Sequence, residues 1–294
     1  MNPDSNELKA LVHKITDLPT LPAMMATITR LMQDPRTSAE ELGRAIASDP
    51  ALVSKVLKLV NSAFYGFPGR ISTITQAIVI LGFSTIRNVV LTTSVLKAFS
   101  RNGSQNGIDV AKFWEHSLLT GAIARSLAVE REANFVEETF IAGLLHDMGR
   151  IVLSQKLTAE FEKVILVKEK AGISQLQAEQ SVLKLTHGDI GGWLARKWNL
   201  PIPYVDVMRF HHTPMESLKQ DPNTQADTTT LIYMVHAADS LSKHLVDGKP
   251  DLSAIHEIDP AVRAELKIGP EGWERFQLRT EEEIGKARAF LEML

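Results

Sequence analysis

Apolar residues recur along most of the chain at spacings of three and four positions, and strict alternation of apolar and polar residues is rare. A spacing of three to four is the period of an amphipathic α-helix, whereas alternation is the period of a β-strand. The pattern therefore predicts an all-α fold. With 294 residues, 44% of them hydrophobic, the chain can bury a substantial core as one large domain or two ordinary ones.

The first hundred residues contain several short helices whose ends are marked in the sequence. Pro22 precedes a helical run of apolar residues that stops near Asp34. Ser38 comes before two glutamates, which suits an N-cap with acids in the first turn, and Pro50 suits the start of the next helix. We therefore predict a set of short helices that pack together.

The most apolar stretch, residues 77–96, is interrupted near its middle by Arg87 and Asn88 and elsewhere by several hydroxyl residues. Polar side chains at these positions disfavour a membrane span, so we predict a buried helix. The N-terminal residues lack the basic segment and apolar core of a secretion signal. We therefore expect a cytoplasmic protein with no membrane span.

A polar segment separates this region from the rest of the chain. Residues 100–109, SRNGSQNGID, include two glycines and favour a linker. We predict three parts: an N-terminal helical lobe over residues 1–105, a helical lobe with the candidate metal ligands over residues 106–246, and a C-terminal helical tail over residues 247–294 that packs on the domain.

Apolar spacing predicts further helices after the linker, with prolines as breaks between them. These helices cover residues 110–130, 134–147, 158–171, 174–184, 187–198 and 203–212. Residues 216–230 are polar and predict a loop before another helix. The three glutamates at positions 281–283 suit the first turn of a final helix.

Charge and composition narrow the chemistry. The formal net charge is -3, so no global basic field attracts the chain to nucleic acid or to anionic lipid, and we expect no nucleic-acid partner. The chain has no cysteine, which excludes disulfides, thiolate metal sites and cysteine nucleophiles together. Any metal ion must therefore be held by nitrogen and oxygen ligands.

The adjacent pair His146 and Asp147 follows the apolar sequence FIAGLL, in a helix that we predict to end at Gly149. Neighbours on a helix point about 100° apart, so the pair alone is weak evidence of a metal site. The evidence for a metal site is stronger because seven histidines and aspartates lie in or beside predicted helices: His116, His146, Asp147, His187, His211, His212 and Asp239. Such a set can hold two divalent transition metals about 3.5–4 Å apart, which activates water for phosphoester hydrolysis.

Each of these residues also has an ordinary explanation. A histidine on a half-buried helix is more often a hydrogen-bonded packing residue than a ligand. His187 can simply be a residue at the start of a helix. His211 and His212 suit a helix C-terminus, where a partly protonated imidazole interacts favourably with the helix dipole. His236 is either a neighbour of the ligands or unrelated to them. Arg150 can bind a substrate phosphate through two hydrogen bonds, or it can be a solvated cation at a helix end.

Two long parts of the sequence resemble the HDOD family, the HD-related output domains. The first covers residues 18–66 and continues through residues 71–91, ISTITQAIVILGFSTIRNVVL. The second covers residues 140–153, FIAGLLHDMGRIVL, and residues 186–212, THGDIGGWLARKWNLPIPYVDVMRFHH. The resemblance covers roughly residues 18 to 240.

The resemblance implies a multi-helical fold related to HD-domain phosphohydrolases, with an N-terminal helical lobe and a place in bacterial signal transduction. Metal-binding HD relatives, including the HD-GYP branch, carry ligands in the order His, His-Asp, His, His-His, Asp. In this chain that order falls on the seven residues named above. The family pattern implies that Asp147 bridges two metals, with His116, His146 and Asp239 on one and His187, His211 and His212 on the other.

The chain departs from the HD-GYP pattern in three places. Relatives with three metals have a glutamate one turn before the first histidine, where this chain has Lys112, so we expect two metals at most. The segment after the His-His pair reads TPMESLKQDPNT and lacks the Gly-Tyr-Pro signature, which argues against hydrolysis of cyclic-di-GMP. Arg150 replaces the usual lysine and keeps its charge with a different geometry.

Two functional hypotheses follow. In the first, the chain is a bacterial signal-transduction protein with one or two divalent transition metals, iron, manganese or zinc. Asp147 and Arg150 then act as catalytic residues of a metal-dependent phosphohydrolase on a nucleotide-type phosphoester. In the second, it is an inactive regulatory domain that binds a signalling protein, and any metal is structural.

Overall fold

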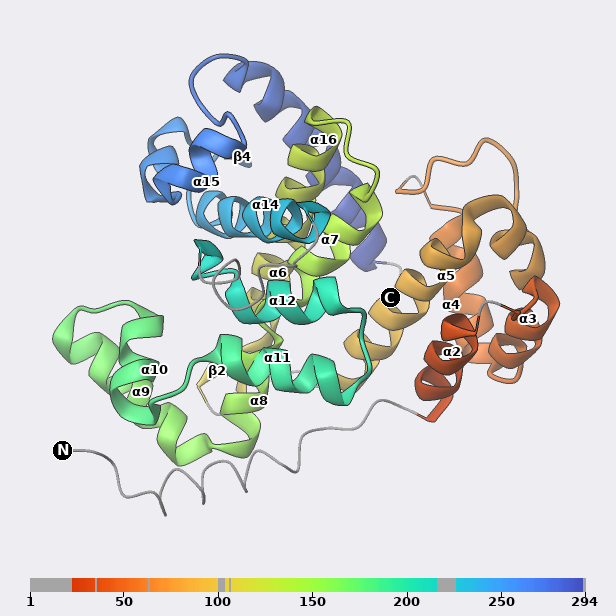
Figure 1. Ribbon diagram of the computed structural model, residues 1–294, viewed down its shortest axis with the longest axis horizontal. Coiled ribbons are helices and arrows are strands. Elements are labelled where there is room, and N and C mark those ends of the chain that lie inside the picture. The colour runs from red at the N-terminus through yellow and green to blue at the C-terminus, as the bar shows by residue number, and fades with distance from the viewer. Residues whose placement is uncertain are drawn as a thin grey trace.

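A computed structural model describes residues 23–34, 36–62, 64–99, 104–105, 107–215 and 226–292. Helices form most of this part of the chain, and two short antiparallel β-ladders lie between them (Figure 1). The all-α fold class predicted from the apolar spacing is therefore confirmed.

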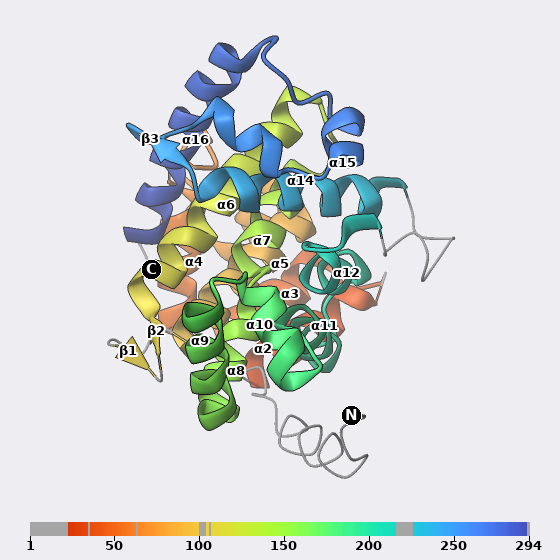
Figure 2. The ribbon, with the colours of Figure 1, turned by 90° about the vertical axis from the view of Figure 1, so that its left-hand side faces the viewer.

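The N-terminal helices gather on one side of the molecule, on the right in Figure 1 and behind the other helices in Figure 2. They are α2 (Ala23–Gln33), α3 (Ala39–Ala47), α4 (Pro50–Val60) and α5 (Ile74–Phe99). Ser38 caps α3, since its Oγ accepts the Glu41 amide at 3.1 Å while the Glu41 carboxylate accepts the Ser38 amide at 2.9 Å. Asp49 caps α4, whose first residue is Pro50. The helix starts predicted at Ser38 and Pro50 are both confirmed.

Helix α5 has a kink at Gly82, whose φ of 85° and ψ of 163° are not helical. By length and composition alone, Ile74–Leu96 is the one helix among the described residues that can cross a membrane, a test that core helices of globular proteins also meet. In this fold Asn88 is fully buried, and its Oδ1 accepts a hydrogen bond from the Tyr204 hydroxyl at 3.0 Å. This burial agrees with the predicted buried helix, and the absence of a membrane span stays a prediction.

The middle of the chain supplies the helices that surround the candidate site. They are α6 (Val110–Glu130), α7 (Val136–Leu145), α8 (Met148–Lys156), α9 (Thr158–Ala171), α10 (Gln175–Leu183), α11 (His187–Lys197) and α12 (Ile202–Phe210). Apart from α8, all of them agree closely with a predicted helix. Before α6, β1 (Ser104–Gln105) pairs with β2 (Ile108–Asp109) inside the predicted linker, of which residues 100–103 and 106 lie outside the described residues.

Gly149 does not end the helix before it, contrary to the prediction. Helix α7 ends at Leu145, the chain bends at His146 and Asp147, and the unpredicted α8 follows. Gly149 lies inside α8, where an added Cβ would collide with the carbonyl oxygen of His187 in α11. The glycine is therefore explained by the close approach of α8 and α11.

The C-terminal part of the described chain packs against α6 and α7. It consists of α14 (Ala226–Ser242), the antiparallel pair β3 (Leu245–Val246) and β4 (Lys249–Pro250), the 3₁₀ helix η1 (Leu252–Glu257), α15 (Pro260–Glu265) and α16 (Trp273–Glu292). Helix α14 contacts α6, α7 and α12, and α16 contacts α6. The division of the chain at positions 105 and 246 stays a prediction.

Two predicted boundaries in this part are wrong. Residues 226–230 belong to α14 and not to a loop, because Thr228 is buried on the same helix as the apolar residues that follow it. The rest of that predicted loop beyond Met215 lies outside the described residues. Helix α16 begins at Trp273, which is buried together with Phe276, so the glutamates at positions 281–283 lie in its middle.

Close packing of α6 on α7 brings the first candidate ligands together. At Gly143 an added Cβ would lie 2.7 Å from the Cα of Gly121 in α6. Only glycine leaves room for so short a distance between two helix backbones. The two glycines therefore set the separation between α6, which carries His116, and the end of α7, where His146 lies.

Candidate metal centre

Seven side chains selected from the sequence meet in the interior of the helical bundle. They come from α6 (His116), the bend between α7 and α8 (His146 and Asp147), the first residue of α11 (His187), the end of α12 (His211 and His212) and α14 (Asp239). Five of them are buried, and the side chains of His116 and His212 are 19% and 25% exposed. We call these seven residues the His/Asp cluster.

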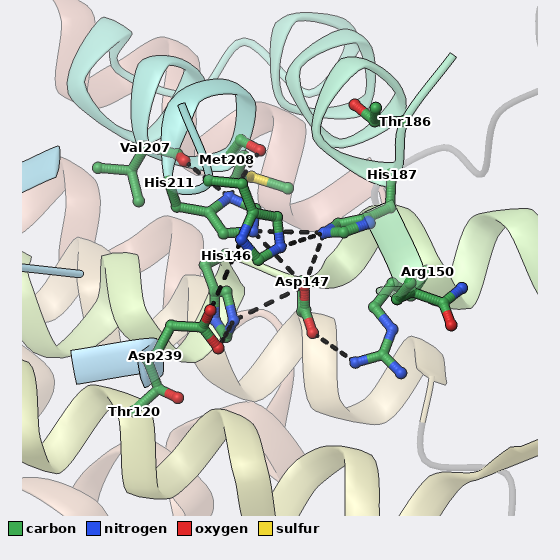
Figure 3. A network of polar contacts seen from close by, with 12 residues as sticks. Thr120, His146, Asp147, Arg150, Thr186, His187, Val207, Met208, His211 and Asp239 are labelled. Atoms are coloured by element: carbon green, nitrogen blue, oxygen red, sulfur yellow. Dashed lines mark hydrogen bonds and ion pairs between the residues drawn. The ribbon is translucent and has the colours of Figure 1, made fainter. Parts of the chain in front are cut away.

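Asp147 lies at the centre of the His/Asp cluster (Figure 3). Its Oδ1 is 3.2 Å from Nε2 of His187 and 3.6 Å from Nε2 of His211. Its Oδ2 is 3.9 Å from Nε2 of His116 and 2.7 Å from Nη1 of Arg150. Oδ1 also lies 3.7 Å from Nε2 of His146. The carboxylate therefore lies among the histidines, and its two oxygens together approach four of them.

The cluster contains two sets of atoms that are close enough to share an ion. In each set one ligand atom per residue lies within 4.8 Å of the others; the sets are Asp147, His187, His211 and His212, and His116, His146 and Asp147. Asp239 adjoins the second set, with Oδ1 3.1 Å from Nε2 of His116 and 3.6 Å from Nε2 of His146. Asp239 also approaches the first set, with Oδ2 3.7 Å from Nδ1 of His212. The structure thus brings together all seven residues, and their division between two metals stays a prediction.

Hydrogen bonds to Nδ1 orient four of the five imidazoles. His146 and His211 donate from Nδ1 to backbone carbonyl oxygens of the helices that precede them, at 2.7 and 3.1 Å. His187 donates from Nδ1 to the Glu179 carboxylate at 2.7 Å. In the neutral form, each of these rings then has its lone pair on Nε2, which points into the cluster.

The fourth imidazole is oriented by a chain of hydroxyl groups. The Ser242 hydroxyl donates to the backbone oxygen of Asp239 at 2.9 Å, so it can only accept a proton from Nδ1 of His116, 3.2 Å away. Thr120 supports this arrangement by donating to the Ser242 oxygen at 3.1 Å. His116 therefore also directs an Nε2 lone pair at the cluster.

The Nε2 atoms of the cluster's histidines have too few hydrogen-bond donors among the described residues. Nε2 of His146 is buried and has no hydrogen-bond partner in the described part of the chain. Nε2 of His187 lies 3.4 Å from Nε2 of His211 and 3.0 Å from Nε2 of His212. Neutral imidazoles with lone pairs so close repel one another unless a proton or a metal ion lies between them.

The two aspartates of the cluster are ionised at neutral pH. Burial alone raises the pKa of a carboxyl group. At Asp147 the nearby His146 and Arg150 outweigh burial and hold the pKa well below its usual range. At Asp239 the nearby His116, His146 and Lys243 likewise outweigh burial and hold the pKa well below its usual range. Two anionic ligands are therefore available to a cation.

The histidines differ in their affinity for protons. Burial lowers the pKa of His187, but the Glu179 and Asp147 carboxylates outweigh it and raise the pKa to about 10. Burial lowers the pKa of His211 to about 4, and burial together with His211 holds the pKa of His212 well below its usual value. In the metal-free protein His187 therefore keeps a proton that a metal ion must displace.

Glu179 is a site residue that the sequence analysis missed. It is fully buried in α10, and its Oε2 accepts from both the amide and Nδ1 of His187, at 2.8 and 2.7 Å. Its Oε1 accepts from Gln175 at 3.0 Å. The available signal was a carboxylate at helical spacing from Leu176 and Leu183, on the apolar face of the predicted helix.

Two further residues, Lys243 and His236, form hydrogen bonds with members of the cluster. Lys243 donates to Oδ2 of Asp239 at 2.8 Å, from one turn later in α14. His236 donates from Nδ1 to the backbone oxygen of His211 at 2.6 Å and accepts the amide of Asp259 on Nε2 at 3.2 Å. His236 therefore contacts the backbone of the cluster and fixes the end of α12.

The three positions at which the chain departs from the HD-GYP pattern lie as follows. Arg150 donates through Nη1 to Oδ2 of Asp147 at 2.7 Å, so part of its guanidinium is used inside the cluster. Lys112 is exposed, with Nζ 3.9 Å from a carboxylate oxygen of Asp109. The sequence TPMESLKQDPNT, which lacks Gly-Tyr-Pro, lies outside the described residues from position 216 onward.

Two hollows reach the cluster at its two partly exposed histidines, His116 and His212. The hollow between α6 and α9 has a volume of about 360 Å³ and is lined by His116 and Arg150. The hollow between α10 and α12 has a volume of about 410 Å³ and is lined by His212 and Arg209. A small molecule can therefore approach the cluster from either hollow.

The donor set fits a divalent transition metal. Imidazole nitrogens and carboxylate oxygens are the ligands that zinc, iron and manganese share. Bonds of about 2.0–2.1 Å place neighbouring ligand atoms roughly 3–4 Å apart. The contacts of Asp147 and Asp239 with the histidines, 3.1 to 3.9 Å, lie in this range. The buried His/Asp cluster resembles the ligand set of HD-domain proteins and indicates a metal site.

Comparison with known families gives a match over two thirds of the chain. The family model of the HDOD domain matches residues 18–214. An uncharacterized protein from Treponema pallidum (strain Nichols) is 27% identical over 204 residues, which are 69% of this chain and 39% of that protein. The chain thus spans about two fifths of the length of this relative.

Solved structures show the same fold. An HDOD domain protein with unknown function from Geobacter sulfurreducens has a TM-score of 0.73 at 23% identity, over 98% of this chain and 97% of that one. A protein from Shewanella amazonensis SB2B, provisionally assigned as a phosphohydrolase, has a TM-score of 0.72 at 23% identity, over 96% of this chain and 98% of that one. These similarities support the predicted HD-like fold.

Proposed function

Because this chain belongs to the HDOD family, we propose that it is a signal-transduction protein whose His/Asp cluster holds one or two divalent transition metals and hydrolyses a phosphoester. Iron, manganese and zinc are the candidate ions. We also propose that it acts in the cytoplasm and contacts a signalling protein.

One observation carries the metal proposal: at least four imidazoles direct their Nε2 atoms toward one buried space. Nε2 of His146 has no hydrogen-bond partner among the described residues, and three other Nε2 atoms lie within 3.4 Å of a neighbouring one. A metal ion that displaces the proton of His187 satisfies these nitrogens with coordinate bonds. Two ionised aspartates supply the compensating negative charge.

The residues divide into two ligand sets in this proposal. His116, His146 and Asp239 form one set, and His187, His211 and His212 form the other. Asp147 contacts both sets with its two oxygens. When bound, a divalent metal supplies Lewis acidity and lowers the pKa of a coordinated water, which is the chemistry that phosphoester hydrolysis requires.

Other side chains prepare this site. Glu179 holds the His187 ring in one orientation, and Lys243 holds the Asp239 carboxylate. Arg150 donates through Nη1 to Oδ2 of Asp147, and its side chain lines the hollow between α6 and α9. It is therefore placed to neutralise a phosphate next to the metal ligands.

A screen of phosphoesters with manganese or iron supplied tests the catalytic part. We expect turnover of at least one phosphomonoester or phosphodiester, and loss of that turnover in His146→Ala, whose side chain is fully buried in the cluster. Lack of any turnover that depends on His146, in protein that does contain metal, would contradict catalysis. The metal would then be structural, which chelation that unfolds the protein would reveal.

A further inference from the structure

The hollow between α6 and α9 combines positive charge with access to the His/Asp cluster. Its cations come from three helices: Lys112 from α6, Arg150 from α8 and Lys168 from α9. His116 also lines it, so the hollow extends from the protein surface to a proposed metal ligand. Positive groups from separate helices that converge beside a metal site suit a ligand with several anionic oxygens.

The hollow is shaped by a close contact between the β1–β2 turn and α9. At Gly107, whose φ is 86°, an added Cβ would lie 2.8 Å from Cδ1 of Ile165. Ile165 and the largely buried rings of Phe113 and Phe161 form the apolar part of the lining. The hollow thus has an apolar side for the rest of a ligand and a charged side for its anionic group.

Two carboxylates also line this hollow, and they limit its positive charge. Asp109 is the N-cap of α6, and its Oδ1 accepts the amide of Lys112 at 3.1 Å. Glu169 is exposed and adjacent in sequence to Lys168. Three cations therefore face two carboxylates, and a metal ion in the cluster would add further positive charge at the inner end.

Arg150 lines this hollow and commits Nη1 of its guanidinium to Asp147. A phosphate oxygen can accept from such a guanidinium without displacing its contact with the carboxylate, because the group has five N–H donors. The hollow between α10 and α12 has a single cationic side chain in its lining, Arg209, together with Asp189.

We propose that the hollow between α6 and α9 binds the phosphate group of the phosphoester, with Lys112 and Lys168 on its two walls and Arg150 beside the cluster. This inference rests on the proposed function, since it names the place where that phosphoester enters. A ligand seated there has its phosphate next to His116 and its remaining part against Ile165.

Calorimetric titration with inorganic phosphate tests the proposal on the full chain, with the metal content of each sample measured in parallel. We expect Lys112→Gln and Lys168→Gln each to weaken phosphate binding by about fivefold, as for an exposed ion pair. Glu169→Gln should strengthen binding, because it removes a negative charge from the same lining. Lys163→Gln is the matched control on α9, exposed and outside the lining, and should leave the affinity unchanged.

Competition experiments then identify the source of the phosphate group. A nucleoside monophosphate that binds more tightly than glycerol phosphate, with the difference reduced in Ile165→Ala, indicates a nucleotide. Equal binding of both indicates a simpler phosphoester, and either result is consistent with the hollow as a phosphate site.

Three results would contradict the proposed phosphate site. Phosphate binding that is absent, that is unchanged in both lysine variants, or that weakens in Arg209→Gln instead, overturns the assignment to this hollow. Failure of the proposed function has a different signature, because protein without stoichiometric metal contradicts the metal centre whatever the lysine variants do.

Discussion

The buried Glu179 carboxylate accepts two hydrogen bonds from His187, one from the ring Nδ1 and one from the backbone amide. A carboxylate that accepts from a metal-binding imidazole fixes its orientation and raises its basicity. We expect Glu179→Gln to weaken metal binding by about 10- to 100-fold. Titration of chelated protein with zinc or manganese measures this, with the exposed Glu162→Gln on α9 as control. Equal affinities in the two variants would contradict the role of Glu179.

The pKa of His187, raised to about 10, makes the stability of the metal-free protein depend on pH. An unfolded histidine has a pKa of about 6.5, so between these values the folded state binds more protons and its free energy of unfolding falls as pH rises. We expect chelated protein to lose stability from pH 6.5 toward pH 10, and the slope to be smaller in His187→Gln.

Urea denaturation at a series of pH values, in the presence of a chelator, provides the measurement. The exposed His256→Gln serves as control and should keep the slope of the unchanged protein. A free energy of unfolding that stays constant or increases over this range, or the same slope in His187→Gln, would show that His187 does not hold its proton.

At the level of residues, the seven candidate metal ligands could be predicted from the sequence, but their convergence in space could not. They span positions 116 to 239, and nothing in apolar spacing tells how the helices that carry them are oriented to one another. The family resemblance supplied that grouping. Glu179 was missed because it belongs to no spaced set of metal ligands, and its contact with His187 depends on how α10 and α11 meet.

Close helix contacts determine the geometry of the cluster at the level of elements. Gly149 allows α8 to touch the backbone of α11 at His187, and this contact brings Asp147 and His187 together. We expect Gly149→Ala to lower the free energy of unfolding by about 3 kcal/mol, because the added methyl group meets a carbonyl oxygen. Denaturation by urea and metal titration should both show the effect.

Gly285 offers a matched control for this substitution. It lies in the interior of α16, where an added Cβ meets no described atom within 4 Å. Gly285→Ala should therefore stabilise the protein by about 0.5–1 kcal/mol through helix propensity. Similar effects of the two substitutions would mean that the contact of α8 with α11 does not constrain the cluster.

Helices with clear ends were predictable from sequence, and helices that meet at a bend were not. Ser38 and Pro50 mark helix starts by local hydrogen bonding and backbone geometry, which need no information on tertiary structure. The bend at His146 and Asp147 contains no glycine or proline, so the apolar run through it resembles one helix. Gly149 then suggested a helix end, whereas its role depends on α11, a distant segment.

At the scale of the whole molecule, Arg125 links three parts of the fold. Its side chain is 13% exposed and pairs with Glu283 of α16 and Glu137 of α7. It also lies 4.8 Å from the ring centre of Phe64, in the turn between α4 and α5. We expect Arg125→Met to destabilise the protein by about 2 kcal/mol, since the buried Glu283 then keeps only Lys286, 3.0 Å from its Oε1.

The exposed Arg288→Met on the same α16 is the control and should change stability by about 0.5 kcal/mol or less. Urea denaturation of both variants gives the comparison. A cost for Arg125→Met no larger than that of the control would show that this contact does not hold the parts together.

The central claim is that the His/Asp cluster binds metal, and the metal content of protein purified without a histidine tag tests it most directly. Inductively coupled plasma mass spectrometry should find at least one equivalent of iron, manganese or zinc per chain, and clearly less in Asp147→Ala, which removes the carboxylate between the two ligand sets. Less than one equivalent in the unchanged protein, with the same value in Asp147→Ala, would contradict it.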